Sequence, residues 1–279
     1  MVGRARRGSS SGGGRILIAI VVALFAIASY YFGTMRVENP VTGEVQRVNM
    51  TTEDEIMMGL QAAPEMAQQF GGLHPDEQAQ QMVDDIGQAI VAESEAGQTD
   101  YQFDFHLLAD AETVNAFALP GGQVFITAAL FERLQTEGQL AGVLGHEIGH
   151  VVARHSAEHI AKAQLMEGLT GAAVIAAYDP ENPSSAQRAQ MAAVVGQLVS
   201  MKYGRDDELE SDQLGVRFMT EAGYDPNALI GVMQILAESG GGGQPEFFST
   251  HPNPENRVEK IEAAIAAEYP DGVPDGLIQ

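Results

Sequence analysis

The chain has 279 residues, a formal net charge of −23 and no cysteine. A chain of this length can bury one large hydrophobic core or two small ones, and its 45% apolar and 19% charged residues are ordinary for a folded protein. The absence of cysteine excludes disulfides, thiolate metal ligands and a thiol nucleophile. The acidity argues against non-specific binding of nucleic acid, which requires a basic surface.

The N-terminal segment combines a basic head with an apolar stretch. Arginine is the only ionisable side chain of residues 1–15, and residues 16–32 carry no charge. An apolar segment of this length is near the short end for a membrane-spanning helix. The positive-inside rule then leaves residues 1–15 in the cytoplasm and the acidic body outside it, anchored in the inner membrane. The alternative is a signal peptide cleaved near Ala28, which would release the body into the periplasm.

Turn residues and hydrophobic periodicity divide the rest of the chain into predicted elements. Residues 33–50 are polar and predict a linker, and Thr52 with Glu55 fits a capping box that begins a helix. We expect one α+β domain over 51–270, mostly helical with a small β-sheet, and a tail over 271–279. The further helices are expected at 75–96, 137–162, 185–202, 205–222, 226–238 and 254–268, and the strands at 101–107, 114–118 and 123–127.

The sequence His146-Glu147-Ile148-Gly149-His150 has the form HExxH and lies in an apolar, helical stretch. Residues four apart share one face of a helix, so both imidazoles can bind the same metal ion. Two neutral imidazoles suit zinc, with one ion per chain. Glu147 follows the first histidine directly and can reach a water beside the metal, which predicts a general base.

Two further patterns surround this motif. Gly142, Gly145 and Gly149 form one stripe of the predicted helix, where each glycine costs about 1 kcal/mol relative to alanine. Such a stripe predicts that another backbone packs very close to the metal site. The inverted pattern HxxEH begins at His155, about 140° from His150 on an uninterrupted helix, among charged neighbours that indicate solvent. We therefore expect His155 to point away from the site.

The third metal ligand is predicted in the acidic segment 205–212. On a helix, Glu208 and Asp212 share a stripe with apolar or small residues, whereas Glu210 lies on a polar stripe. Two carboxylates that face a core are costly unless cations or donors meet them. Zinc can meet Glu208, and the N–H of a ligand imidazole can meet Asp212 in a supporting role.

These segments together resemble a known family, the zinc metallopeptidases that include HtpX, the CAAX prenyl proteases and the periplasmic BepA/LoiP-type proteases. The resemblance covers roughly residues 51–268. It implies a gluzincin-type fold with His146, His150 and Glu208 as ligands, Glu147 as base and Asp212 as orienting group. The blocks that carry it are Asn115 to Gly122, the VLGHEIGH segment with Arg154 and His155, residues 208–212, and Thr250-His251-Pro252 followed by Arg257.

The predicted function is hydrolysis of peptide bonds in unfolded or damaged exported proteins, as part of quality control in the cell envelope. The strand over 114–118 is expected to pair with an extended polypeptide substrate, with Asn115 and Ala116 near it. His251 is a candidate contact for the transition state, and a histidine at a helix start is an equally good interpretation. One alternative is a zinc-stabilised chaperone or assembly factor with weak or no proteolysis, and another is zinc-dependent hydrolysis of a different bond. The oligomeric state is not predicted.

Overall fold

The computed structural model describes residues 11–177, 203–239, 245–253 and 256–279. The helix expected at 185–202 lies outside these residues. The described chain divides into two compact units, of which the smaller contains residues up to 36, 47–49 and 158–177. The larger contains residues 37–46, 50–157 and those from 203 onward.

The smaller unit contains the long apolar helix α1 (Ser11–Gly33). Its segment Gly14–Gly33 has a mean hydropathy of 2.4 and is, by length and composition, the one helix in the described part of the chain that could cross a membrane. Most of α6 (His155–Ala177) belongs to the same unit. The Cβ of an alanine at Gly168 of α6 would lie 2.5 Å from the Cβ of Ala26, so the two helices approach closely there.

The larger unit has a three-stranded sheet in the order β3-β5-β4. β3 (Asp104–Leu108) runs parallel to β5 (Gln123–Thr127), with Asp104 opposite Gln123, and β4 (Ala116–Ala118) is an antiparallel edge strand. β5 agrees with its predicted range, and the other two strands are shorter than expected. The Pro-Gly-Gly turn before β5 holds Gly121 and Gly122 at φ values of 86° and 113°, which favour glycine.

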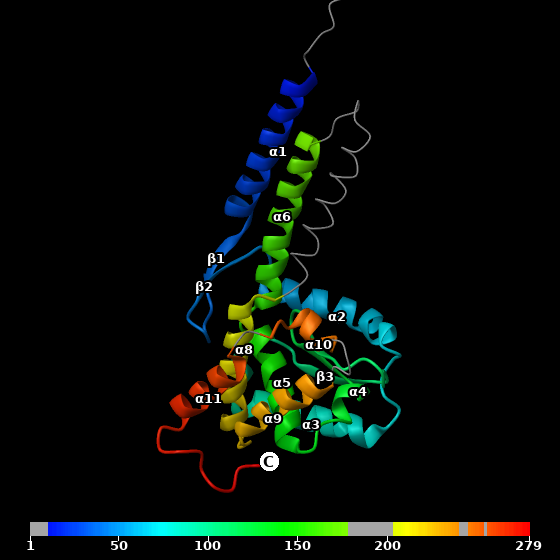
Figure 1. Ribbon diagram of the computed structural model, residues 1–279, viewed down its shortest axis with the longest axis vertical. Helices are drawn as coiled ribbons and strands as arrows, with labels where there is room; N and C mark the ends of the chain where they lie inside the picture. The colour runs from blue at the N-terminus through cyan, green and yellow to red at the C-terminus, as the bar shows by residue number, and fades with distance from the viewer. Residues whose placement is uncertain (1–10, 178–202, 240–244, 254–255) are drawn as a thin grey trace, which may run out of the picture. The chain divides into compact units, whose positions relative to one another are not determined.

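A buried helix occupies the middle of the larger unit. α5 (Glu137–Val152) packs against α8 (Arg205–Glu221), α9 (Asn227–Glu238), α3 (Glu77–Glu93) and β4, as Figure 1 shows for the helices. The other described helices are α2 (Thr52–Gln69), α4 (Ala128–Phe131), α10 (Phe247–Thr250), α11 (Arg257–Glu268) and the 3-10 turn Glu95–Gln98. The prediction of a mostly helical α+β fold with a small sheet is therefore confirmed.

The glycine stripe of α5 marks a close helix contact, as predicted. A Cβ at Gly145 would lie 3.2 Å from the carbonyl oxygen of Gly215, and one at Gly149 would lie 3.1 Å from that of Ser211. Both partners belong to α8, so the two helices approach almost backbone to backbone. Glu208 and Asp212 are thereby held beside the histidines of α5.

Three local predictions were wrong. The capping box of α2 is formed by Thr51 and Asp54, one residue earlier than expected. The segment expected as a linker contains the strands β1 (Met35–Glu38) and β2 (Val45–Val48), which pair with each other. The helix expected at 137–162 is two helices, because Arg154 between α5 and α6 has a left-handed φ of 58°.

Buried polar contacts explain the break between α5 and α6. Arg154 donates to Glu55 through Nε at 2.9 Å and through Nη2, and Nη2 also donates to the carbonyl of Met50 at 3.0 Å. The last carbonyls of α5 accept hydrogen bonds from the side chains of Asn39 and Gln46. These contacts satisfy the helix end and hold the arginine in a conformation that its local sequence does not favour.

The C-terminal residues, expected as a tail, also make ordered contacts. Ile278 forms a bridge beside Tyr224, and its N–H donates to the carbonyl of Gly223 at 3.0 Å. The domain limits 51–270 and 271–279 otherwise stay predictions.

Candidate metal centre

Four buried side chains converge between α5, α8 and α10. His146, His150, Glu208 and His251 each offer a ligand atom, and these atoms all lie within 4.8 Å of one another. Nε2 of His146 is 3.1 Å from Nε2 of His150, and the Glu208 carboxylate is 3.6 Å from the first and 3.5 Å from the second. The structure thus brings the three predicted ligands together and adds His251.

The donor set fits a divalent cation such as zinc. Glu208 is fully buried, and its Oε2 has no hydrogen-bond partner in the described part of the chain, although Arg257 Nη1 lies 3.2 Å away as an ion pair. Two imidazole nitrogens and a carboxylate that point at one spot offer lone pairs in the N and O combination that zinc takes. A cation there would relieve the cost of burying these converging acceptors.

Glu147 lies next to this cluster and is also fully buried. Neither of its carboxylate oxygens has a hydrogen-bond partner among the described residues, and Oε1 is 3.7 Å from Nε2 of His251. Burial raises the pKa of Glu147 above its ordinary value, against the opposing effect of the neighbouring histidines. A carboxylate with a raised pKa and free lone pairs can take up and hold a proton.

The electrostatics of the histidines and of Glu208 also suit metal binding. Burial lowers the pKa of His150 well below its ordinary value, which favours the neutral imidazole that a metal requires. Burial acts to raise the pKa of Glu208, but hydrogen bonds with His150 and His251 outweigh it and hold the carboxyl ionised. The pKa of His251 is raised, because Glu147 and Glu208 together outweigh the effect of burial.

Asp212 contacts the outer nitrogen of His146, as the sequence predicted. Its Oδ1 is 3.0 Å from Nδ1 of His146, so the imidazole can donate there and direct its Nε2 lone pair at the cluster. Arg257 binds the same carboxylate with two hydrogen bonds, from Nε at 2.7 Å and from Nη2 at 2.8 Å. Arg257, for which the sequence predicted no role, is 2% exposed and bridges Asp212 and Glu208.

The expected position of His155 was wrong. His155 is 2% exposed, and its Nδ1 is 2.8 Å from Nδ1 of His150. The break at Arg154 places this side chain against His150. Glu210, expected in solvent, is half-buried and lies 3.0 Å from Nε2 of His155. Tyr203, which the sequence analysis did not single out, stacks on His150 with ring centroids 4.1 Å apart.

The two residues expected near a substrate, Asn115 and Ala116, lie beside and within the small sheet. Asn115 is 3% exposed, its backbone pairs with Thr127, and its Oδ1 has no partner among the described residues. Ala116 begins the edge strand β4, which packs against α5. No hydrogen bond joins Asn115 to the metal-centre cluster within the described residues.

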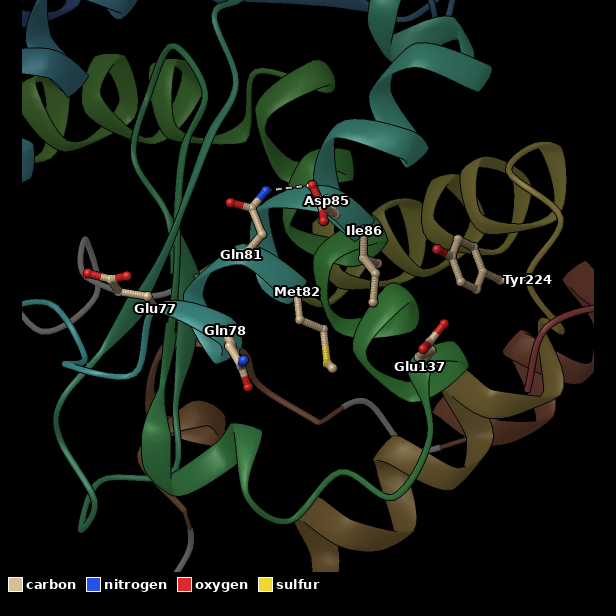
Figure 2. Close-up of a pocket in the computed structure, with 8 residues that line it drawn as sticks. All are labelled: Glu77, Gln78, Gln81, Met82, Asp85, Ile86, Glu137 and Tyr224. Carbon is tan, nitrogen blue, oxygen red and sulfur yellow. Dashed lines mark hydrogen bonds between the residues drawn. The ribbon is translucent and has the colours of Figure 1, made fainter.

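A separate pocket of the larger unit lies away from this cluster. It has a volume of about 660 Å³ and contains none of the four clustered residues. Figure 2 shows its lining, in which Gln81 donates to Asp85 at 2.7 Å and the carboxylates of Glu77, Asp85 and Glu137 lie apart from one another. The lining residues are Glu77, Gln78, Gln81, Met82, Asp85, Ile86, Glu137 and Tyr224. Nothing in this lining provides a base beside a metal-binding group.

A buried HExxH helix with a buried glutamate of a second helix beside its histidines is the arrangement typical of metal-dependent peptidases. Comparison with protein families agrees, because the model of peptidase family M48 matches residues 77–265. The chain belongs to peptidase family M48 and is a metallopeptidase.

Named relatives support this assignment. The chain is 32% identical to mitochondrial metalloendopeptidase OMA1 of Schizosaccharomyces pombe over 247 residues, 86% of this chain and 69% of that protein. It is 31% identical to the beta-barrel assembly-enhancing protease of Escherichia coli over 190 residues, 64% of this chain and 37% of that protein. Metalloprotease YcaL of Escherichia coli is 30% identical over 159 residues, 55% of this chain and 59% of YcaL. The chain spans less than half the length of the beta-barrel assembly-enhancing proteases that it matches.

Proposed function

We propose that this metallopeptidase is a zinc-dependent endopeptidase that cleaves unfolded or damaged exported proteins at the cell envelope. The observation that carries the proposal is the convergence of His146, His150 and Glu208 beside the unpartnered, buried carboxylate of Glu147. The first three would hold the zinc ion. A zinc ion held there would supply Lewis acidity, which polarises a carbonyl group and makes water a better nucleophile near neutral pH.

The protein's own groups then perform the proton transfers. Glu147 takes a proton from the attacking water and later gives it to the leaving amine, for which its raised pKa is suited. His251, whose pKa is also raised, would face the negative charge that develops on the substrate carbonyl oxygen. Asp212 and Arg257 keep His146 in the tautomer that leaves Nε2 free for the metal.

The edge strand supports a polypeptide substrate. In the described chain β4 pairs with β5 along one side only. Its other edge can accept an extended peptide through main-chain hydrogen bonds, a mode that requires an unfolded segment more than a particular sequence. Just before β4, the carbonyl of Val114 already accepts a hydrogen bond from Phe247, so the free edge is confined to residues 116–118.

A matched pair of variants tests the enzyme. Glu147→Gln keeps the size of the side chain but removes the base, so cleavage of casein by the full chain in detergent should fall at least about 100-fold while zinc is retained. Glu137→Gln, at the exposed start of the same helix, should cleave like the wild type. A zinc-loaded wild type that cleaves no unfolded polypeptide, with a cellular role that survives Glu147→Gln, would instead support a chaperone.

The location of the enzyme is a second part of the proposal. The basic residues before α1 support an N-terminus in the cytoplasm and a catalytic unit in the periplasm, anchored to the inner membrane. A reporter fused after Gln279 should be active only outside the cytoplasm, and cytoplasmic activity would overturn this orientation. Intact mass of the mature protein decides between an anchor and cleavage near Ala28.

A further inference from the structure

The two ring nitrogens of His150 face different surroundings. Nε2 points at the metal centre, 3.5 Å from the carboxylate of Glu208. Nδ1 points the opposite way and lies 2.8 Å from Nδ1 of His155. Nε2 of His155 in turn lies 3.0 Å from a carboxylate oxygen of Glu210. The three side chains therefore form a line that leads from the metal centre to the half-exposed Glu210.

We propose that His155, held by Glu210, is the positioning residue that fixes the tautomer and ring orientation of His150 as a metal ligand. This inference rests on the proposed function, because it takes His150 Nε2 as a ligand atom. It concerns a different side of the site from Asp212 and Arg257, which serve His146.

The proton positions follow from the contacts. If Nε2 of a neutral His150 gives its lone pair to a metal, the ring proton is on Nδ1. That proton is donated across the 2.8 Å contact, so Nδ1 of His155 must be the acceptor. Neutral His155 then carries its own proton on Nε2, where the Glu210 carboxylate accepts it. Each donor therefore has an acceptor. Among the described contacts, the Ser211 hydroxyl could also donate to His155 Nδ1, but at 3.4 Å this hydrogen bond is weaker.

The fold gives His155 this position at a cost, which indicates that the position is specified. On a continuous helix His155 would lie about 140° from His150. The left-handed Arg154 changes that direction, and a non-glycine residue in this region is unfavourable by roughly 1–2 kcal/mol. The buried ion pair with Glu55 holds the arginine in place. His155 is then buried against His150, with ring centroids 4.9 Å apart.

Zinc affinity of the full chain in detergent, measured by competition with a chromogenic chelator, tests this inference. His155→Ala should weaken zinc binding about 10- to 100-fold, the usual effect of losing such an outer partner. His155→Asn places an amide oxygen near the lost Nδ1 and should restore most of the affinity. His159→Ala, one turn further along α6 and outside the metal cluster, is the matched control and should bind zinc like the wild type.

A spectroscopic measurement separates positioning from general loss of structure. The visible absorption bands of the Co²⁺-loaded protein report ligand geometry, so they should change in His155→Ala and return towards wild type in His155→Asn. If His155→Ala does not fold, Glu210→Ala on the half-exposed side should still weaken zinc binding in the same direction. Wild-type affinity and spectra in both His155→Ala and Glu210→Ala would overturn the inference. A wild type that binds no zinc would instead overturn the proposed function.

Discussion

Replacement of Arg257 by methionine tests how the acidic side of the metal centre is stabilised. Arg257 is buried and makes two hydrogen bonds to Asp212, at 2.7 and 2.8 Å, and an ion pair at 3.2 Å with Glu208. Methionine fills a similar apolar volume but provides no charge. Both carboxylates, which are at most 1% exposed, would lose their guanidinium partner.

The magnitude follows from these contacts. Removal of one partner of a buried, hydrogen-bonded ion pair costs about 3–5 kcal/mol, because an uncompensated charge stays in the interior. We therefore expect Arg257→Met to lower the free energy of unfolding of the metal-free protein by about 3–5 kcal/mol, a large part of the 5–15 kcal/mol typical of a domain. The double variant Arg257→Met with Asp212→Asn removes both charges of the pair. Its loss in free energy of unfolding should be at least about 1 kcal/mol smaller than the sum of the losses of the two single variants.

The assay is urea unfolding followed by far-UV circular dichroism, with EDTA present and with detergent for the N-terminal helix. All three variants and the wild type are measured under the same conditions. A loss below about 1 kcal/mol for Arg257→Met would show that Arg257 does not stabilise the two carboxylates, and so would a double variant whose loss equals the sum of the single losses.

Three further predictions concern packing, pH and the helix break. Gly149→Ala places a Cβ 3.1 Å from a carbonyl oxygen of α8 and should destabilise the protein by about 1–3 kcal/mol in thermal unfolding. The control is Gly171→Ala, whose new Cβ would have nothing within 4 Å, and this variant should be as stable as the wild type or more stable in the same assay. Burial acts to raise the pKa of Asp212, but the nearby Arg257 guanidinium and His146 imidazole have a larger opposite effect, so folding lowers this pKa. Its contribution to stability is therefore present above its unfolded pKa of about 3.9 and lost as pH falls through the lower folded value. Asp212→Asn should accordingly flatten the acid limb of the unfolding free energy below about pH 5, and an unchanged limb would contradict this. Glu55→Ala leaves Arg154 buried without its carboxylate partner. The variant should lose about 3–5 kcal/mol of unfolding free energy in urea and should bind zinc more weakly. Wild-type stability and wild-type zinc affinity would show that this ion pair does not hold the break between α5 and α6.

Much of the site could be predicted because its residues obey helical periodicity. The spacing of His146 and His150 places both on one face of α5, and the spacing of Glu208 and Asp212 places both on the buried face of α8. The glycines of α5 also predicted that another backbone packs very close, since glycine in a helix is unfavourable unless something packs against it, and at Gly145 and Gly149 that backbone is α8. The convergence of these side chains is observed, and their roles as ligands and base stay proposals.

The position of His155 could not be predicted, because its cause is distant in the sequence. Local propensity continues the helix through Ala153 and Arg154, and nothing nearby signals a left-handed residue. The interaction that holds Arg154 comes from Glu55, at the start of another helix. The strands β1 and β2 escaped prediction for a similar reason. Each has only four residues, and the side chains of Asn39 and Gln46 are fixed by carbonyls at the end of α5, far away in the sequence.

The most direct test of the metal centre is anomalous diffraction at the zinc absorption edge from crystals of the wild-type protein grown with zinc. The geometry predicts one strong peak per chain, within about 2.2 Å of Nε2 of His146, Nε2 of His150 and a carboxylate oxygen of Glu208. A peak at another cluster, or no peak in a protein that cleaves casein, would contradict the assignment of this site as the catalytic metal centre.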